Sequence, residues 1–390
     1  MQKSKIVSIG LAIFTMLFGA GNVIFPLILG REAGTSVFYA IGGFFLTAVA
    51  VPLLGLVSVM LFEGDYHLFL KNMGRIPAML VAFICMILIG PFGATPRCVA
   101  LSHSVLSWHL PNLSLFVYSI IAAIIIFFLT MKKNAVVTIF GRILGPLKLI
   151  LLFSIIIIGL LNPLPLESTG ISPWQGFING LKEGYLTMDL LATIFFSGLI
   201  YGGLKQLSGN TAHNHKKLAL AGLKAGIIGG GLLGAVYLGF CLIAAMYGPH
   251  VASIAPDKIL SALASIILGS KAGILANITV AVACLTTAIA LTAVVADYVS
   301  HELFKGKINY LHALLLTVVA TFAMTNLGFA GIMKVIAPLV ELCYPALITL
   351  AIANLLQKLF GFAYTQIITL VVFVLTCAIQ YGSFFTLCAK

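Results

Sequence analysis

The stretch FGAGNVIFP, residues 18 to 26, interrupts an apolar run that extends from residue 6 to residue 30. Two glycines, an asparagine and a proline weaken helical hydrogen bonding, because glycine and asparagine are poor helix formers and proline has no backbone N–H. Irregular backbone at membrane depth survives only where protein buries it or where it lines a cavity. The stretch therefore predicts a broken transmembrane helix that faces a cavity.

Composition assigns the chain to the membrane proteins. It has 390 residues, of which 61% are hydrophobic and 8% are charged, whereas a typical soluble domain is about 25% charged. Most of its apolar runs reach the roughly 20 residues that a helix needs to cross a bilayer. We predict an all-α integral membrane protein with one transmembrane domain over residues 1–390 and about eleven spans. The runs are residues 6–30, 38–62, 77–101, 113–131, 135–161, 173–203, 217–247, 270–300, 309–327, 332–357 and 364–386.

The distribution of lysine and arginine predicts how these spans are oriented in the membrane, because cytoplasmic loops carry the excess of positive charge. With the amino terminus in the cytoplasm, twelve of the 22 basic residues lie on the cytoplasmic side, five lie on the opposite side and five lie within spans. This distribution predicts a multi-pass protein with a cytoplasmic amino terminus. The twelve are Lys3, Lys5, Lys71, Arg75, Lys132, Lys133, Lys205, Lys216, Lys217, Lys305, Lys307 and Lys358.

The remaining composition excludes several other functions. The net charge of +12 comes from basic residues scattered through short loops, without the aromatic-studded basic stripe expected of a nucleic-acid binder, so lipid headgroups are the expected partner. The seven cysteines include no CxxC pair and are expected to act as small hydrophobes. No HExxH, GxSxG or Walker-type segment is present, so we expect neither an enzyme nor a cofactor.

A second interruption falls in the run that opens at Pro173, where GYLTMDLLA places glycine, threonine and aspartate at residues 184 to 192. Five spans occupy residues 6–161 and five more occupy residues 173–357, with an extra helix at 364–386. Each interruption is thus in the first helix of its own half. This arrangement predicts a five-plus-five inverted repeat with discontinuous helices 1 and 6, whose paired breaks form a binding site near the bilayer midplane.

A broken helix offers unpaired N–H groups at one half-helix start and unpaired C=O groups at the other half-helix end. The amides attract anions and the carbonyls attract cations. An amino acid carries both charges, so the breaks suit a zwitterion, and Gly19 and Gly21 would let it approach the backbone closely. Close helix packing is the alternative explanation for the small residues, but packing requires neither Asn22 nor Pro26.

Five motifs in this order resemble the bacterial branched-chain amino acid:cation symporter family. They are FGAGNVIFP at 18–26, GPFGATPR at 90–97, GYLTMD at 184–189, ACLTTAIALT at 283–292 and YP at 344–345. The resemblance implies a LeuT-like fold and cation-coupled import of leucine, isoleucine and valine across the bacterial inner membrane. The family usually has twelve spans, so either the carboxyl terminus of this chain lies outside or our span count is short by one.

The same resemblance implies specific ligands. The carboxylate of the substrate would contact the amides of Ala20 and Gly21, with Asn22 nearby. A sodium ion would be held by two carbonyl oxygens before the break and by oxygens on one later helical face. The implied sodium ligands are the carbonyls of Thr15, Phe18 and Ala283 and the hydroxyls of Thr286 and Thr287. Positions 283, 286 and 287 share a helical face, and hard cations prefer such oxygen ligands.

Charged side chains within spans are expected to have a bonding partner or a functional role, since inserting an acidic side chain at the centre of a membrane helix costs about 2.5–3.5 kcal/mol. Asp189 would either cap the second half of its helix or bind the substrate ammonium or the cation, alongside Thr187 and Met188 at the break. Glu341 would be a protonated structural residue or a proton-coupling carboxylate. Arg97, close to the outer end of the third span, would pair with an acid or gate the outer vestibule.

We therefore predict a secondary transporter that imports a branched-chain amino acid with a cation, sodium or else a proton, by alternating access. By position, Ile24, Met188 and Phe195 are expected to line the side-chain pocket. Three alternatives remain open at this point: a proton-coupled carrier of another small neutral amino acid, a sensor that binds without transporting, and an intramembrane protease that pairs Asp189 with Asp297 or Glu341.

Overall fold

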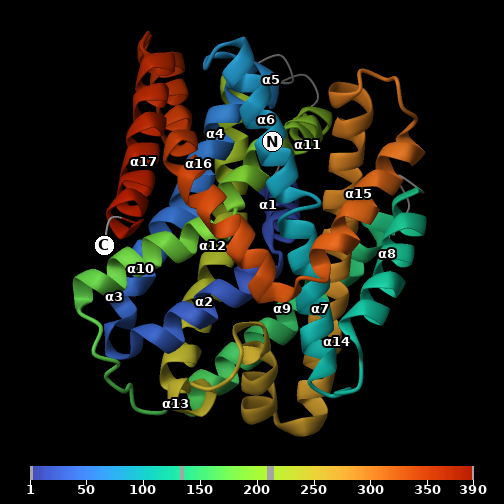
Figure 1. Ribbon diagram of the computed structural model, residues 1–390, viewed down its shortest axis with the longest axis vertical. Helices are drawn as coiled ribbons and strands as arrows, with labels where there is room; N and C mark the ends of the chain where they lie inside the picture. The colour runs from blue at the N-terminus through green and yellow to red at the C-terminus, as the bar shows by residue number, and fades with distance from the viewer. Residues whose placement is uncertain (1–2, 132–135, 209–214, 389–390) are drawn as a thin grey trace.

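The structure is a computed structural model that describes residues 3–131, 136–208 and 215–388, and these residues fold as helices and connecting loops without a β-strand (Figure 1). Short 3₁₀ or π-helical turns join several of the helices. In chain order the helices are α1 (Lys3–Leu17), α2 (Ala20–Ala33), α3 (Val37–Phe45), α4 (Val51–Met60), α5 (Tyr66–Lys71), α6 (Arg75–Ile89), α7 (Ala94–Ser107), α8 (Leu115–Met131), α9 (Val136–Leu161), α10 (Pro173–Leu186), α11 (Asp189–Ser208), α12 (His215–Met246), α13 (Gly248–Val251), α14 (Ile259–Tyr298), α15 (Tyr310–Thr325), α16 (Gly328–Phe360) and α17 (Thr365–Cys388).

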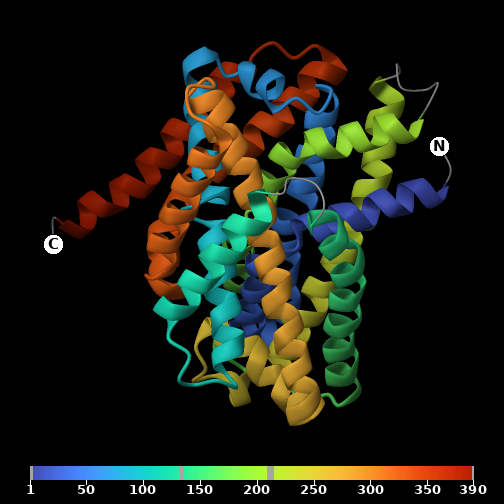
Figure 2. The same cartoon turned by 90° about the vertical axis from the view of Figure 1, so that its right-hand side faces the viewer.

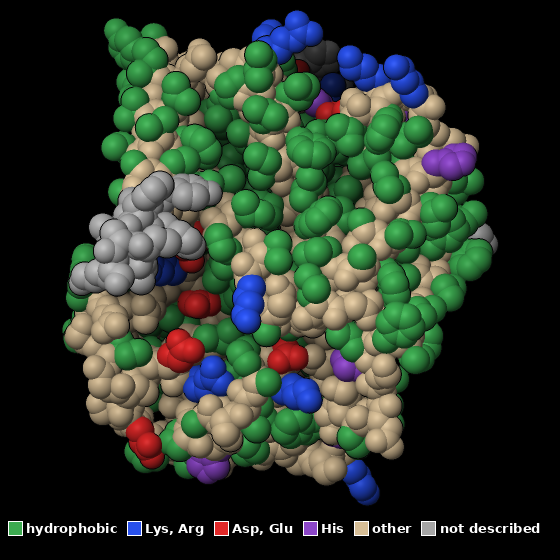
Figure 3. Space-filling view, in the orientation of Figure 1, with side chains coloured by type: hydrophobic (Ala, Val, Ile, Leu, Met, Phe, Trp, Pro, Cys, Tyr) green, Lys and Arg blue, Asp and Glu red, His purple; other side chains and the backbone are tan. Residues whose placement is uncertain are grey.

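The apolar helices follow the eleven predicted runs in order. Six helical stretches, some of which include a short break, are long and apolar enough to cross a membrane, and five shorter apolar helices accompany them among the described residues. Figure 3 shows hydrophobic side chains over the upper and middle parts of one face, with lysine and arginine at its upper end and again, beside acidic side chains, in its lower half. A broad exposed apolar surface of this kind is typical of a protein that lipid surrounds.

The first and sixth spans are both broken, which confirms the prediction of discontinuous helices. The first divides into α1 and α2 between Leu17 and Ala20, and the sixth divides into α10 and α11 between Leu186 and Asp189. In Figure 2, α1 projects away from the bundle on one side and α17 projects on the other. Helix α12 packs against both α1 and α2, so it lies along the first break.

A third interruption corrects the boundary that we predicted for the third span. This span extends from Arg75 to Ser107 rather than ending at residue 101, and a turn at residues 90–93 divides it into α6 and α7. Gly93 is needed there, because a Cβ atom at that position would lie 1.8 Å from the carbonyl oxygen of Leu88. Arg97 therefore lies in the first turn of α7, well inside the span, and not at its outer end.

Helices α3 and α10 pack closely at Gly180, so a substitution of this glycine tests the packing of the two helices. A Cβ atom on Gly180 would lie 2.0 Å from the backbone oxygen of Ala40, whereas one on Gly42 would meet only Phe177, at 3.9 Å. We expect Gly180→Ala to lower the melting temperature of the purified protein by several degrees, because overpacking costs about 1–3 kcal/mol. Gly42→Ala, in the same helix pair, should leave it nearly unchanged. Equal melting temperatures for the two variants would contradict this packing.

Candidate functional site

The two breaks meet at the centre of the bundle. A Cβ atom on Gly21 would lie 3.3 Å from both the Cα and the carbonyl oxygen of Thr187. One residue later, the Asn22 amide donates to both carboxylate oxygens of Asp189, at 2.8 and 2.9 Å. A direct hydrogen bond thus joins α2 to α11, although 167 positions separate the two residues.

The first break has the geometry of an open helix start. Gly19 is extended (φ −117°, ψ −163°), and its N–H donates to the Asn22 side-chain oxygen at 2.7 Å. Ala20 and Gly21 are the first residues of α2, where backbone N–H groups have no carbonyl partner within the helix. Asn22 therefore closes the turn with its oxygen and binds Asp189 with its nitrogen.

The second break turns at Met188, a non-glycine residue with φ of +62°. Such a conformation is rare for a side chain with a Cβ, so the surrounding contacts must hold it in place. The Thr187 hydroxyl donates to the carbonyl of Gly184 at 2.8 Å and supports the end of α10. The carboxylate of Asp189, by contrast, forms its bonds with α2 and α12 rather than with the first turn of α11.

Tyr237 on α12 is a site residue that we did not predict. Its hydroxyl donates to Asp189 Oδ2 at 2.7 Å and also contacts the Asn22 amide. Tyr237 is fully buried, and a buried tyrosine hydroxyl usually has a hydrogen-bond partner. A tyrosine within an apolar run was therefore a signal, but nothing in the sequence says which of the distant polar groups it meets.

Arg97 reaches the same place from α7. It is 2% exposed, its Nη1 donates to the carbonyl of Leu186 at 2.7 Å, and its guanidinium lies 5.5 Å from the centre of the Phe25 ring. Leu186 is the last residue of α10, so the cation sits at the negative end of that half-helix. The third break thus supplies a positive charge to the junction of the other two.

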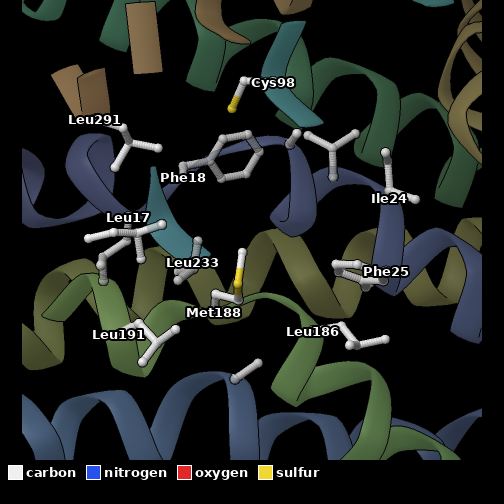
Figure 4. Packing of buried hydrophobic residues seen from close by; sticks show 14 of the residues in the cluster. Leu17, Phe18, Ile24, Phe25, Cys98, Leu186, Met188, Leu191, Leu233 and Leu291 are labelled. Carbon is white, nitrogen blue, oxygen red and sulfur yellow. The ribbon is translucent and has the colours of Figure 1, made fainter. Parts of the chain in front are cut away.

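A small cavity of about 30 Å³ lies among these groups. Figure 4 shows Cys98 and Met188 pointing toward Phe18, with Leu17 and Leu291 beside them. The volume is far below that of an ordinary small-molecule pocket, so the helices must shift to admit an amino acid. The lining residues are Met16, Leu17, Gly19, Ala20, Gly21, Asn22, Ile89, Ala94, Arg97, Cys98, Thr187, Met188, Asp189, Ala192, Phe196, Thr287 and Leu291.

Four of the five residues that we predicted as sodium ligands form one chain of contacts. The Thr287 hydroxyl lies 3.5 Å from the carbonyl oxygen of Phe18 and 3.1 Å from that of Ala283. The Thr286 hydroxyl lies 2.8 Å from the same Ala283 oxygen. The Thr15 hydroxyl donates to the carbonyl of Leu11 within α1 at 2.9 Å, and the Thr15 carbonyl, which is the atom that we predicted as a ligand, stays a prediction.

Several other predicted residues lie elsewhere. Glu341 on α16 does not line the cavity, and its carboxylate accepts a 3.4 Å bond from Gln380 on α17. Of the three expected pocket residues, only Met188 is in the lining, because Phe195 packs against Tyr66 and Ile24 lies in the core.

The carboxylate pair of the protease alternative is not formed. Asp189 is bonded to Asn22 and Tyr237, and Asp297 lies 3.4 Å from His301, with half of its side chain exposed. Neither Asp297 nor Glu341 lines the cavity that contains Asp189.

Broken helices that meet beside groups of opposite charge are the arrangement by which secondary transporters bind their substrates. Two solved structures share the fold: the inward-facing conformation of Mhp1 (TM-score 0.64, 14% identity, 90% of this chain and 77% of that one) and MhsT in complex with L-phenylalanine (TM-score 0.59, 13% identity, 95% and 98%). The model of the branched-chain amino acid transport protein family matches residues 2–386. The chain belongs to this family.

Its relatives are named as permeases and not as enzymes. The branched-chain amino acid permease BrnQ of Bacillus subtilis (strain 168) is 31% identical in a match of 371 positions that covers 92% of this chain and 83% of the relative. This match covers most of both chains, and the family model, over residues 2–386, extends through all three breaks.

Proposed function

We propose that this protein imports leucine, isoleucine and valine together with sodium across a bacterial inner membrane, with its amino terminus in the cytoplasm. The observation that supports this function best is the direct bond between the two breaks, Asn22 to Asp189, beside a cluster of oxygens that includes Phe18 and Thr287. The repeats over residues 6–161 and 173–357 would rock against one another around this fixed junction, as in other inverted-repeat carriers.

The cavity lining matches a zwitterion with an aliphatic side chain. Apart from Thr287 on α14, the hydrogen-bonding and charged side chains of the lining lie at the breaks, where the Asp189 carboxylate can accept a bond from an ammonium group and the open amides of α2 can bind a carboxylate. Apolar residues such as Phe196 and Leu291 form the rest of the wall. Because one methylene changes binding by only about 1–3 kcal/mol, the three branched-chain substrates should compete closely.

Sodium is the proposed coupling ion because the contact chain consists of neutral oxygens. Phe18 and Ala283 contribute carbonyls, and Thr287 contributes a hydroxyl, which are ligands that suit a hard cation. Glu341, the alternative proton carrier, lies outside the cavity and contacts α17. Each sodium ion moved inward would gain about 2.3 kcal/mol per 100 mV of membrane potential.

Reconstituted protein tests this function directly. Liposomes that contain the purified chain should accumulate labelled leucine when an inward sodium gradient is imposed, and excess isoleucine or valine should suppress the signal. A proton gradient alone should give no accumulation. If uptake is driven only by a proton gradient, the coupling ion is the proton and not sodium. If leucine binds but does not accumulate under either gradient, the protein is a sensor and not a carrier.

The two threonine hydroxyls allow the ion site to be tested separately. Thr286→Ala combined with Thr287→Ala removes two oxygens next to the Ala283 carbonyl. We expect the sodium concentration for half-maximal uptake to rise about 10-fold or more, because a bond to a charged group is worth about 1.5–3 kcal/mol. Thr349→Ala, which removes a hydroxyl bonded within α16, is the matched control. Unchanged sodium activation in the double variant would exclude these hydroxyls from the ion site.

A further inference from the structure

We infer that Arg97 binds the carboxylate of the transported amino acid, together with the open amides of Ala20 and Gly21. The inference rests on the proposed function and specifies how the substrate is held within the same cavity. Arg97, Ala20 and Gly21 all line that cavity, although they come from α7 and α2.

The guanidinium of Arg97 has an N–H donor that is not hydrogen-bonded. Its Nη1 donates to Leu186 and lies 3.9 Å from the sulfur of Met333, while its Nε is buried without a partner among the described residues. A guanidinium has five N–H donors in a fixed plane, and a carboxylate accepts two of them side by side. An unpaired buried donor is costly, so a carboxylate arriving there is stabilised.

The charge of Arg97 is also incompletely matched. Asp189 acts on it through space, but both Asp189 oxygens are already engaged by Asn22, and one of them also by Tyr237. No ion pair between Arg97 and a carboxylate is formed in the part of the chain that the structure describes. Burying a cation without a bonded anion costs several kcal/mol, and the carboxylate of a substrate would offset this cost.

The remaining groups fix the direction in which the zwitterion binds. Arg97 and the open amides of α2 attract a carboxylate, whereas Asp189 and the carboxyl-terminal carbonyls of α1 attract an ammonium group. A substrate whose carboxylate faces Arg97 therefore presents its ammonium group to Asp189. Its side chain is left against the apolar wall at Phe196 and Leu291.

Arg97 could instead serve only to cap the end of α10 through Leu186, and the two roles predict different responses to ligand chemistry. L-leucinamide keeps the ammonium group and side chain of leucine but has a neutral amide in place of the carboxylate. Binding of leucine and of leucinamide to the purified full-length protein in lipid nanodiscs is measured by calorimetry, for the unmodified chain and for Arg97→Gln. Circular dichroism and the melting temperature report whether each variant is folded.

The unmodified protein should bind leucine about 10- to 100-fold more tightly than leucinamide, as expected for a bond between two charged groups. In Arg97→Gln, leucine affinity should fall while leucinamide affinity changes little, so the ratio of the two should drop about 10-fold or more. If the affinities for leucine and for leucinamide fall by the same factor, Arg97 acts only through the structure of the break, and the inference is overturned. If the unmodified protein binds no leucine, the result contradicts the proposed function itself and not only the role of Arg97.

A matched arginine provides the control. Arg31 on α2 also donates to a backbone carbonyl, that of Ile254, at 2.8 Å, but it does not line the cavity. Arg31→Gln should leave the ratio of leucine to leucinamide affinity unchanged. If Arg97→Gln does not fold, Arg97→Lys carries the test, because lysine keeps the charge but cannot form the paired bonds. The ratio should then fall several-fold, and an unchanged ratio would contradict the inference.

Discussion

Replacing Asp189 with leucine is expected to abolish concentrative leucine uptake, with a loss of at least about 100-fold in initial rate. Asp189 is 1% exposed and accepts bonds from Asn22 and Tyr237. A leucine of similar size leaves the Tyr237 hydroxyl proton and one of the two Asn22 amide N–H groups buried without an acceptor, at a cost of about 1–3 kcal/mol each. It also removes the only carboxylate among the residues that line the cavity, so the substrate ammonium loses its counterion.

The Asp189→Asn variant separates the loss of the buried hydrogen bonds from the loss of the negative charge. The asparagine oxygen can still accept a bond from Asn22 or Tyr237, so the melting temperature should fall less than in Asp189→Leu. The negative charge is nevertheless gone, so uptake should fall nearly as far. Asp297→Asn is the control, because that carboxylate lies at the end of α14 beside His301 and half of its side chain is exposed. Leucine uptake by Asp189→Leu at a rate near that of the unmodified protein would remove Asp189 from the site.

Sequence alone predicts the two breaks because their cause is local. Glycine, asparagine and proline weaken a helix wherever they occur, and in an apolar run this effect is visible without any tertiary information. The contact between the breaks follows from the repeat pattern, and the bond from Asn22 to Asp189 is consistent with it. The observed breaks, between Leu17 and Ala20 and between Leu186 and Asp189, overlap the predicted stretches 18–26 and 184–192, although Gly21, Asn22 and Pro26 lie inside helix α2.

The parts that sequence did not predict depend on distant contacts. Asn22 and Tyr237 are 215 positions apart, and no periodicity relates them. Arg97 was misplaced for a different reason: the predicted apolar run ends at residue 101, shortly after Arg97, whereas the helix continues to Ser107. The packing of α7 against α14 is a tertiary contact that the hydropathy of the run does not reveal.

The remaining prediction with a large effect concerns the point where the two breaks touch. Gly21→Val is expected to reduce leucine affinity by roughly 100-fold, because the added atoms would enter both the contact and the cavity. A Cβ atom at position 21 would already lie 3.1 Å from the Phe25 ring and 3.3 Å from the backbone of Thr187. Since the cavity measures only about 30 Å³, the two further methyl groups of valine leave no space for a substrate unless α2 and α11 separate.

Two other glycine variants turn this steric effect into a graded test. Gly21→Ala adds the Cβ atom alone, and the neighbours need to yield by only a few tenths of an ångström, so its leucine affinity should lie between those of the unmodified protein and Gly21→Val. Gly231→Val, on the exposed face of α12, has no atom within 4 Å of its Cβ position and should bind leucine normally. Calorimetry on folded samples of all three variants gives the comparison. Normal leucine binding by Gly21→Val would mean that the substrate does not reach the junction of α2 and α11, and the binding site would have to lie elsewhere in the bundle.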